Sequence, residues 1–325
     1  MHKSKILKFA LAAVSAALLC AEAAAQSYPN KPIRWLVGYP AGGGADFIAR
    51  TIGGQLSINT GQPVVIDNRP GASTIIAAEA TAKSAPDGYT MMNADNGTLV
   101  FNPALYSKLP YDPLTDLAPV SLIVRVPLLL VAHPSFAGND AKGFVGQAKA
   151  QPGKLSYGSP GAGTPHHLAM EMFKRATGTD LVHVPYKGAA PAVQDLIAGQ
   201  IPLMILDTAV ALPQIRAGKI KALGALTPAR LASLPDVPTM NEQGIADVVA
   251  YAWLGMVVPT ATPKETVAAL NAGIVKAVQS PAVNTKLRDF GMEPLTSTPE
   301  QMRDYIQSES KRWHALIKER NIRLD

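Results

Sequence analysis

Cysteine is almost absent from this chain of 325 residues, since the only one is Cys20, close to the N-terminus. Small secreted proteins commonly depend on disulfides, but a chain of this length can bury two α/β cores without them. The composition therefore excludes a disulfide scaffold. It also leaves no cysteine nucleophile in the body of the chain.

Long apolar runs are missing as well. The longest, residues 9–19, has about 11 residues, whereas a membrane-spanning helix needs about 20. Lysines precede this run, and residues 23–25 supply the small side chains of a signal-peptidase site. We interpret residues 1–25 as a secretory signal peptide and expect the mature protein in a bacterial periplasm. Cys20 would mark a lipoprotein, but Leu19 occupies a position where lipid-attachment signals have a small residue.

Neither basic nor acidic residues form a cluster anywhere in the sequence. The net charge of the whole chain is +6, and cleavage after residue 25 would remove three lysines and one glutamate, leaving +4. No basic stripe with interleaved aromatic residues is present, which argues against nucleic acid as a partner. The mild positive charge would attract an anionic ligand only weakly at physiological salt.

Catalytic and metal-binding patterns are also lacking. The segment 158–161 does not fit the G-x-S-x-G nucleophile elbow. His166 and His167 are adjacent, so on a helix their side chains point about 100° apart, and His133 and His183 have no metal-type spacing. We therefore predict no metal, no cofactor and no enzymatic activity, although carboxylate pairs formed only on folding are left open.

What is present is a regular alternation of strand-like and helix-like segments. Strands are expected at 33–37, 64–66, 89–93, 120–124, 128–132, 155–159, 181–184, 201–206, 220–226 and 253–258. Helices are expected near 45–58, 73–84, 165–177, 189–198, 209–217, 263–279, 281–290 and 299–319. This alternation predicts an α/β protein with parallel sheets covered by helices. The lack of a low-complexity tether favours a chain that crosses twice between two lobes.

Two of the C-terminal helices have good start signals. Thr262-Pro263 and Thr298-Pro299 each pair a capping hydroxyl with a proline at the first helical position. Glutamate or glutamine follows three residues after each threonine and completes a capping-box spacing. The last helix should pack on a sheet through one apolar face, formed by Met302, Ile306, Trp313, Leu316 and Ile317.

Two glycine-rich loops, about 115 residues apart, each follow a strand and precede a helix. The first contributes the candidate ligand-binding residues Tyr39, Ala41, Gly42, Gly43, Gly44 and Asp46. The second contributes Ser159, Gly161, Gly163 and Thr164. Glycines at such a turn let backbone N–H groups converge where the following helix has its positive dipole end. Two such loops suggest two lobes that close on one anionic ligand.

The first loop fails two nucleotide-binding templates. Gly44 stands where a P-loop needs lysine, and Phe47 stands where G-x-G-x-x-G needs its third glycine. Mononucleotide and dinucleotide binding are therefore excluded. A site for a smaller anion and an ordinary tight turn both remain open.

Four charged or titratable side chains have two interpretations each. Asp46 and Asp207 are candidate ligand contacts, but each also fits a helix cap. Asp46 would repel an anion unless the ligand also carries an amine. His166 either lines the site or has a structural role, and Lys187 either pairs with a carboxylate or is simply exposed.

The chain resembles a known family, the periplasmic solute receptors of tripartite tricarboxylate transporters, often called Bug-type receptors. The matching segments cover nearly all of the mature chain in order. They are residues 39–46, 49–50, 68–72, 86–90, 184–191, 195–196, 199–201, 234–239, 253–255, 259 and 262–263. One departure is Pro202-Leu203, where the family more often has a polar residue.

The resemblance implies a type II periplasmic binding protein, with two α/β lobes joined by a hinge of two crossing strands. Lobe one would comprise residues 27–125 plus 254–325, and lobe two residues 126–253. One ligand carboxylate would be held by backbone groups of the two glycine loops, in part through ordered waters. The far end of the ligand would be read by Asn96, Thr98, His166, Lys187, Gly188, Asp207 and Trp253.

The implied function is a non-enzymatic receptor that captures a small organic carboxylate and delivers it to an inner-membrane permease. We favour a dicarboxylate or an aromatic carboxylate, because Tyr39, His166 and Trp253 could line an aromatic pocket. We expect a monomer. Two alternatives stay open: a sensor that presents its closed form to a kinase ectodomain, and a secreted α/β hydrolase that uses Ser159.

Overall fold

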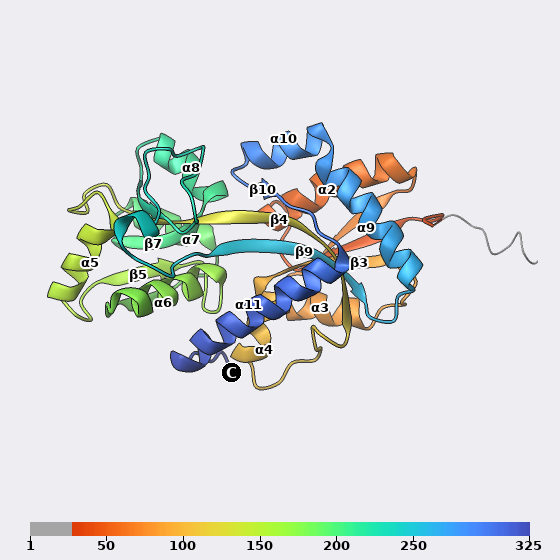
Figure 1. Cartoon of the computed structure of the whole chain (residues 1–325), viewed down its shortest axis with the longest axis horizontal. Helices are drawn as coiled ribbons and strands as arrows, with labels where there is room; N and C mark the ends of the chain where they lie inside the picture. The colour runs from red at the N-terminus through yellow and green to blue at the C-terminus, as the bar shows by residue number, and fades with distance from the viewer. Residues whose placement is uncertain (1–27) are drawn as a thin grey trace, which may run out of the picture.

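The computed structural model describes residues 28–325 as an α/β protein with two lobes along its long axis (Figure 1). The expected signal peptide lies outside the described residues. The strands are β1 (Ile33–Val37), β2 (Val64–Asn68), β3 (Thr90–Asp95), β4 (Leu117–Ala132), β5 (Ser156–Ser159), β6 (Val182–Pro185), β7 (Leu203–Asp207), β8 (Lys221–Ala225), β9 (Tyr251–Pro259) and β10 (Glu293–Pro294).

The helices confirm most of the expected positions. They are α2 (Gly44–Thr60), α3 (Ile75–Ala82), α4 (Asn102–Leu105), α5 (Ala141–Ala150), α6 (Pro165–Thr177), α7 (Ala189–Ile197), α8 (Thr208–Arg216), α9 (Lys264–Gln279), α10 (Pro281–Asp289) and α11 (Pro299–Glu319). Three short turns, Ala72–Thr74, Gly97–Phe101 and Asn241–Gln243, complete the described elements.

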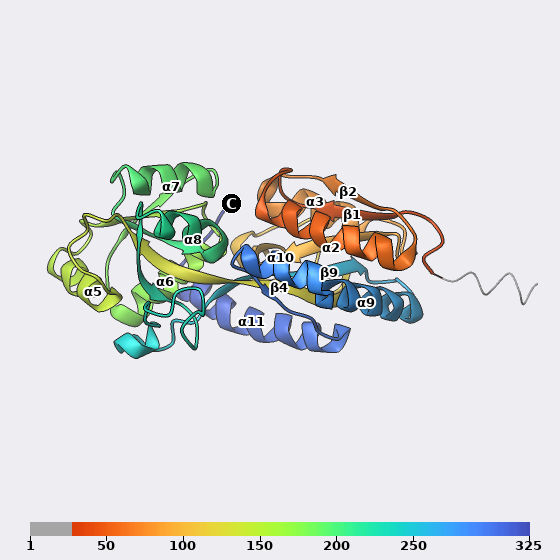
Figure 2. The ribbon, with the colours of Figure 1, turned by 90° about the horizontal axis from the view of Figure 1, so that it is seen from above.

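Each lobe is built on three parallel strands. In lobe one, β1 lies between β2 and β3, and β9 joins β3 in the antiparallel direction. In lobe two, β5 pairs with β6 and β7 in parallel, and β4 joins β7 and β8 in the antiparallel direction. The predicted parallel sheets are therefore present, but each is completed by antiparallel strands. Helices cover the faces of both sheets (Figures 1 and 2).

Strands β4 and β9 run side by side from one lobe to the other and form the connection between them (Figure 1). The prediction of two separate strands at 120–124 and 128–132 is wrong, because β4 is one strand of 16 residues. Proline lacks the N–H that a ladder needs. Pro127 is tolerated because it pairs with Tyr251, the first residue of β9, so the lost hydrogen bond falls where this ladder ends.

Helix α11 packs its apolar face on the crossing strands, as predicted. Met302, Ile306, Trp313, Leu316 and Ile317 are all buried. The ring of Trp313 packs edge-on against Phe101, and its indole N–H donates to Glu309 Oε2 at 2.9 Å. The burial of this face ties the C-terminal helix to lobe one and to β4.

The two predicted capping boxes have different outcomes. At Thr298 the box is complete: the side chain accepts from Gln301 N at 3.1 Å, and Gln301 Oε1 accepts from Thr298 N at 2.9 Å. The cap at Thr262 is wrong. Its hydroxyl donates to the Pro259 carbonyl at 2.7 Å, and Pro263 occupies the N-cap position without a side-chain bond. The Thr262 hydroxyl therefore stabilises the turn after β9 and does not cap α9.

The C-terminal segment lies between the two lobes (Figure 2). Arg320 Nε donates to Glu171 Oε2 on α6 at 2.7 Å, and Leu324 N donates to the Leu105 carbonyl after α4 at 3.0 Å. A Cβ built on Gly163 would lie only 2.6 Å from Leu324 Cδ1. The tail therefore contacts α4 of lobe one and the glycine loop of lobe two together.

Glycine is required on β9 at Gly255. A Cβ there would overlap Met302 Cε and lie 2.9 Å from Met302 Sδ, so a larger side chain would force the buried Met302 side chain out of its place between α11 and β9. We expect Gly255→Val to lower the free energy of unfolding by about 1–3 kcal/mol, the usual cost of overpacking. Urea unfolding followed by circular dichroism measures this change.

The matched control is Gly54→Ala on α2. Gly54 is exposed, and a Cβ there meets nothing within 4 Å. Alanine in a helix interior is more stable than glycine by about 0.5–1 kcal/mol, so this variant should gain stability. Equal effects of the two substitutions would contradict the close packing of α11 on β9.

Candidate functional site

The first glycine loop connects β1 to α2 and is exposed from Tyr39 to Gly44. Gly43 is the N-cap of α2, and no side chain caps it. Gly42 has a φ of +83°, which favours glycine. A helix of 17 residues thus begins at an exposed loop with no capping side chain, and its first-turn N–H groups carry the positive end of the helix dipole.

Asp46 does not cap this helix, so that interpretation is wrong. It lies inside the first turn, where its carboxylate accepts from Gly42 N and Arg50 Nε, both at 2.9 Å, and from Asn68 Nδ2 at 3.0 Å. The hydrogen bond from Arg50 is the main reason that the pKa of Asp46 is lowered to about 2. The carboxylate is 3% exposed and already paired, so it holds the loop in place.

Tyr39 and Thr98 are joined through Asp95, at the end of β3. The Tyr39 hydroxyl donates to Asp95 Oδ2, while Asp95 Oδ1 accepts from the backbone N–H and the hydroxyl of Thr98, both at 2.8 Å. Desolvation of the hydroxyl group, together with the charge of Asp95, raises the pKa of Tyr39 above its usual value, although the residue as a whole is 38% exposed. The Thr98 hydroxyl also bonds to Thr74 at 2.6 Å. Both side chains are therefore held in an internal network that shapes the loop.

Asn96 lies next to the backbone of Trp253. Asn96 Nδ2 donates to the Tyr251 carbonyl at 3.2 Å, and Asn96 Oδ1 accepts from Trp253 N at 2.8 Å. Asn96 thereby fixes the end of β3 to the crossing strand β9. The Trp253 ring is fully buried against Tyr305, and its Nε1 has no hydrogen-bond partner among residues 28–325.

A third loop lies beside the first one, and sequence analysis did not identify it. Ala72, Ser73 and Thr74 have φ values of 44°, 50° and 71°, so three successive residues other than glycine adopt the left-handed region. Such residues are strained and often occur at ligand sites. A Cβ on Gly38 would lie 2.9 Å from Thr74 Cβ, which places this loop against the first one. No glycine marks these three positions, so the sequence carries no signal for them.

The second glycine loop connects β5 to α6, and its hydroxyl groups are used internally. Ser159 is fully buried, and its hydroxyl lies 2.7 Å from His183 Nε2. Thr164 caps α6 by accepting from His167 N at 3.3 Å and donates to the Gly161 carbonyl at 2.7 Å. Gly163 has a φ of +74°. What the loop presents is therefore mainly backbone.

The remaining candidates lie around this second loop. Gly188 is the N-cap of α7 and is tied to the loop by its N–H bond to the Pro160 carbonyl at 2.9 Å. Asp207 caps α8, as one interpretation predicted, by accepting from Val210 N at 3.1 Å. Its other oxygen lies 3.3 Å from His166 Nε2. Lys187 is exposed, and its contribution to a ligand stays a prediction.

The two lobes meet through α8 and the turn after α10. The Thr208 hydroxyl at the start of α8 donates to the Gly291 carbonyl, and a Cβ on Gly291 would lie 2.8 Å from Leu212 Cδ1. On the lobe-one side, Phe290 stacks on Phe47 of α2 with ring centroids 4.1 Å apart. Thr208, the first residue of α8, therefore lies at the boundary between the lobes, and Asp207 directly precedes it.

Comparison with known proteins identifies the family. The family model for the tripartite tricarboxylate transporter family receptor, TctC, matches residues 48–322. The chain belongs to this family. Protein BugT of Bordetella pertussis is 36% identical over 325 residues, which is all of both chains. A protein of Pseudomonas sp. strain P51, from an intergenic region between two tcb genes, is also 36% identical and covers 98% of each chain.

Solved structures confirm the fold of this receptor. A Rhodopseudomonas palustris protein with adipate has 35% identity and a TM-score of 0.83, covering 90% of this chain and 98% of its own. The periplasmic binding protein BugD has 32% identity and a TM-score of 0.79, covering 91% and 99%. MatC from R. palustris with bound malate also has 32% identity and a TM-score of 0.79, covering 89% and 100%. The predicted type II periplasmic binding protein fold is thus confirmed.

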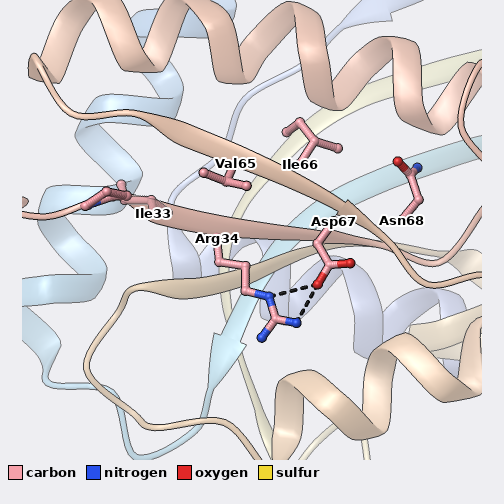
Figure 3. A pocket seen from close by; sticks show the side chains of 7 residues that line it. Ile33, Arg34, Val65, Ile66, Asp67 and Asn68 are labelled. Carbon is pink, nitrogen blue, oxygen red and sulfur yellow. Dashed lines mark hydrogen bonds and ion pairs between the residues drawn. The ribbon is translucent and has the colours of Figure 1, made fainter.

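A surface depression of this receptor lies at the edge of lobe one, on β1 and β2 (Figure 3). It has a volume of about 460 Å³. Its charged groups are paired, because Asp67 Oδ2 accepts from Arg34 Nε at 2.9 Å and from Arg69 Nε at 3.1 Å. It contains none of the predicted ligand-binding residues.

No group of three or more histidine, cysteine, aspartate or glutamate side chains within residues 28–325 is arranged to hold a metal ion. In the same part of the chain, no helix combines the length and the apolar character needed to cross a bilayer.

Behind the second loop, two histidines form a stack in which His167 is buried and His183 is partly buried. The His183 ring lies between Tyr157 and His167, with centroid distances of 4.8 and 4.0 Å. Tyr157 donates to Glu171 at 2.9 Å, which links the stack to the Glu171–Arg320 pair. Burial lowers the pKa of His167 to about 3 and the pKa of His183 to about 4. Both rings are neutral at pH 7.

These two histidines make the stability of the receptor sensitive to acid. In the unfolded chain they titrate near pH 6.5, whereas in the folded protein they do so near 3 and 4. Below pH 6.5 the unfolded state binds the extra protons, so the free energy of unfolding should fall as the pH drops towards 4. The slope should reach about 1.4 kcal/mol per pH unit for each histidine.

Urea midpoints of the wild type and of His167→Gln/His183→Gln, measured from pH 7.5 to 4, test this expectation. The double variant should be less stable at pH 7.5, because it loses the stack, but its stability should vary less with pH. A wild-type slope that persists unchanged in the double variant would contradict the assignment.

Proposed function

We propose that this protein is a periplasmic solute receptor that holds a small organic carboxylate between its two lobes and delivers it to a tripartite membrane permease. The observation that carries the proposal is the exposed glycine loop before α2, where the Gly43 N-cap has no capping side chain. Such a helix start suits a carboxylate. Adipate and malate in two related structures support this ligand class.

The internal hydrogen bonds of the loop side chains indicate which groups would bind each end of the ligand. Asp46, Ser159 and Thr164 are all engaged in internal hydrogen bonds. We therefore assign the carboxylate chiefly to the backbone N–H groups of Gly43 and Gly44. The N–H groups of Gly42, Gly161 and Gly163 already donate to Asp46, Ser159 and His167, so these three residues would contact the ligand through ordered waters. We assign the far end of the ligand to His166, Lys187, Gly188 and Asp207. Asn96, Thr98 and Trp253, whose side chains are buried, would shape this end of the site, and Tyr39 and Ala41 belong to the first loop at the carboxylate.

Ligand capture would work by closure of the lobes around β4 and β9. We take lobe one as residues 27–125 and 254–325, and lobe two as 126–253. Contacts that the ligand makes with both lobes exist only in the closed form, so binding shifts the equilibrium towards it. The closed receptor, acting as a monomer, would then dock on the permease. No catalytic step is proposed, because the Ser159 hydroxyl is fully buried.

The decisive variant is Gly43→Val. A Cβ on Gly43 meets only the Pro40 carbonyl, at 3.5 Å, so the chain should fold normally while the new side chain covers the helix start. Hydrogen bonds to a charged group contribute about 1.5–3 kcal/mol each, so the affinity for the carboxylate should fall by about 100-fold or more. Isothermal titration calorimetry measures the loss, and Gly54→Ala in the same helix is the control. An unchanged affinity would remove the first loop from the site.

A thermal-shift screen tests the ligand class. Linear diacids, hydroxy acids, amino acids and aromatic acids should be compared with neutral solutes, such as sugars, at equal concentration. A ligand present at about 100 times its Kd stabilises the folded state by about 2.7 kcal/mol, which corresponds to a rise in Tm on the order of 5 °C. A shift produced only by neutral solutes would contradict carboxylate binding.

A further inference from the structure

His166 is held in one orientation by a carboxylate. It is the second residue of α6, directly after the second glycine loop, and its Nε2 lies 3.3 Å from Asp207 Oδ2. Asp207 is itself fixed, because its Oδ1 accepts from Val210 N at the start of α8. The imidazole side chain is only 11% exposed. Ring rotation would break the contact with Asp207, so each ring nitrogen has a defined place.

This contact determines what the other ring nitrogen can do. A carboxylate only accepts hydrogen bonds, so the proton of the neutral imidazole belongs on Nε2. Nδ1 is then a lone pair that needs a donor. Nδ1 of His166 is buried and has no hydrogen-bond partner among residues 28–325. Buried polar atoms are normally paired, so an unpaired acceptor calls for an explanation.

The position of the pair points to the ligand as the missing partner. His166 follows β5 and Asp207 ends β7, so both lie at the carboxyl ends of parallel strands in lobe two. In open α/β sheets this edge is where ligands bind. The next residue, Thr208, bonds to Gly291 across the lobe boundary. His166 Nδ1 therefore lies at the edge of the lobe-two sheet that faces lobe one.

We propose that His166 Nδ1 accepts a hydrogen bond from the ligand, and that the ligand is therefore a carboxylate that also carries a donor, either a hydroxyl or an ammonium group. This inference rests on the proposed carboxylate-receptor function and narrows it. A plain diacid would place acceptor oxygens against an acceptor nitrogen. His166 thus selects hydroxy or amino acids over their unsubstituted counterparts.

Matched ligand pairs test the inference on the purified protein. Succinate, malate and aspartate differ only at one carbon, as do glutarate, 2-hydroxyglutarate and glutamate, and adipate and 2-hydroxyadipate; benzoate with 3-hydroxybenzoate covers aromatic acids. In the series that binds best, calorimetry should show the donor-bearing member binding about 10–100-fold more tightly. The hydroxyl and ammonium arms identify which donor is used. A wild type that binds the plain member equally or more tightly would overturn the inference.

Three substitutions separate the nitrogen's role from simple packing. His166→Asn places an amide oxygen near the Nδ1 position and should keep the preference. His166→Gln can still reach Asp207 but leaves the Nδ1 position empty, so it should lose the preference, as should His166→Leu. All three should still bind the plain member, which shows that the site is folded.

The outcomes distinguish this inference from the function on which it rests. If the preference for the donor persists in His166→Leu, His166 does not read it and the inference fails while the receptor function stands. If the wild type binds no carboxylate of any series at millimolar concentration, the proposed function fails, and the inference fails with it.

Discussion

The antiparallel pairing of β4 with β9 is the interaction on which the rest of this structure depends. β4 is shared by both sheets: its first part pairs with β9 and β10, and its last part pairs with β7 and β8. The carboxyl ends of β1 and β5 are positioned relative to each other mainly through this pair, with the Thr208–Gly291 bond and the C-terminal tail as additional links. Asn96 and Met302 both pack against β9, so the end of β3 and the C-terminal helix depend on the same strand.

Charge is arranged so that backbone groups, and not side chains, are left available in the first loop. Asp46 is neutralised by Arg50, and α6 and α8 are capped by Thr164 and Asp207. Helix α2, by contrast, has no side-chain cap. Backbone N–H groups are kept in every substitution except one to proline, so an anion site of this kind would keep its preference while the surrounding side chains vary.

Local patterns were enough to predict much of the fold. Helix α6 has the predicted bounds, and the capping box at Thr298 formed, because both depend on residues within one turn. The predictions failed where a distant group competed. Asn68, 22 residues away, joins the nearby Arg50 in binding the carboxylate of Asp46, and pairing with β9 makes β4 one continuous strand. The left-handed run at Ala72–Thr74 is set by packing against Gly38, which no local pattern records.

The position of Leu324 has a consequence for how the chain can be extended. Its side chain fits between Leu105 and Gly163, and the following Asp325 accepts a bond from Ser107 N at 2.5 Å. Any residues joined after Asp325 would begin at the seam between the lobes. A purification tag or fluorescent protein fused there would start between the lobes, beside the second loop. The amino-terminal end of the described chain, by contrast, lies at the far side of lobe one (Figure 2).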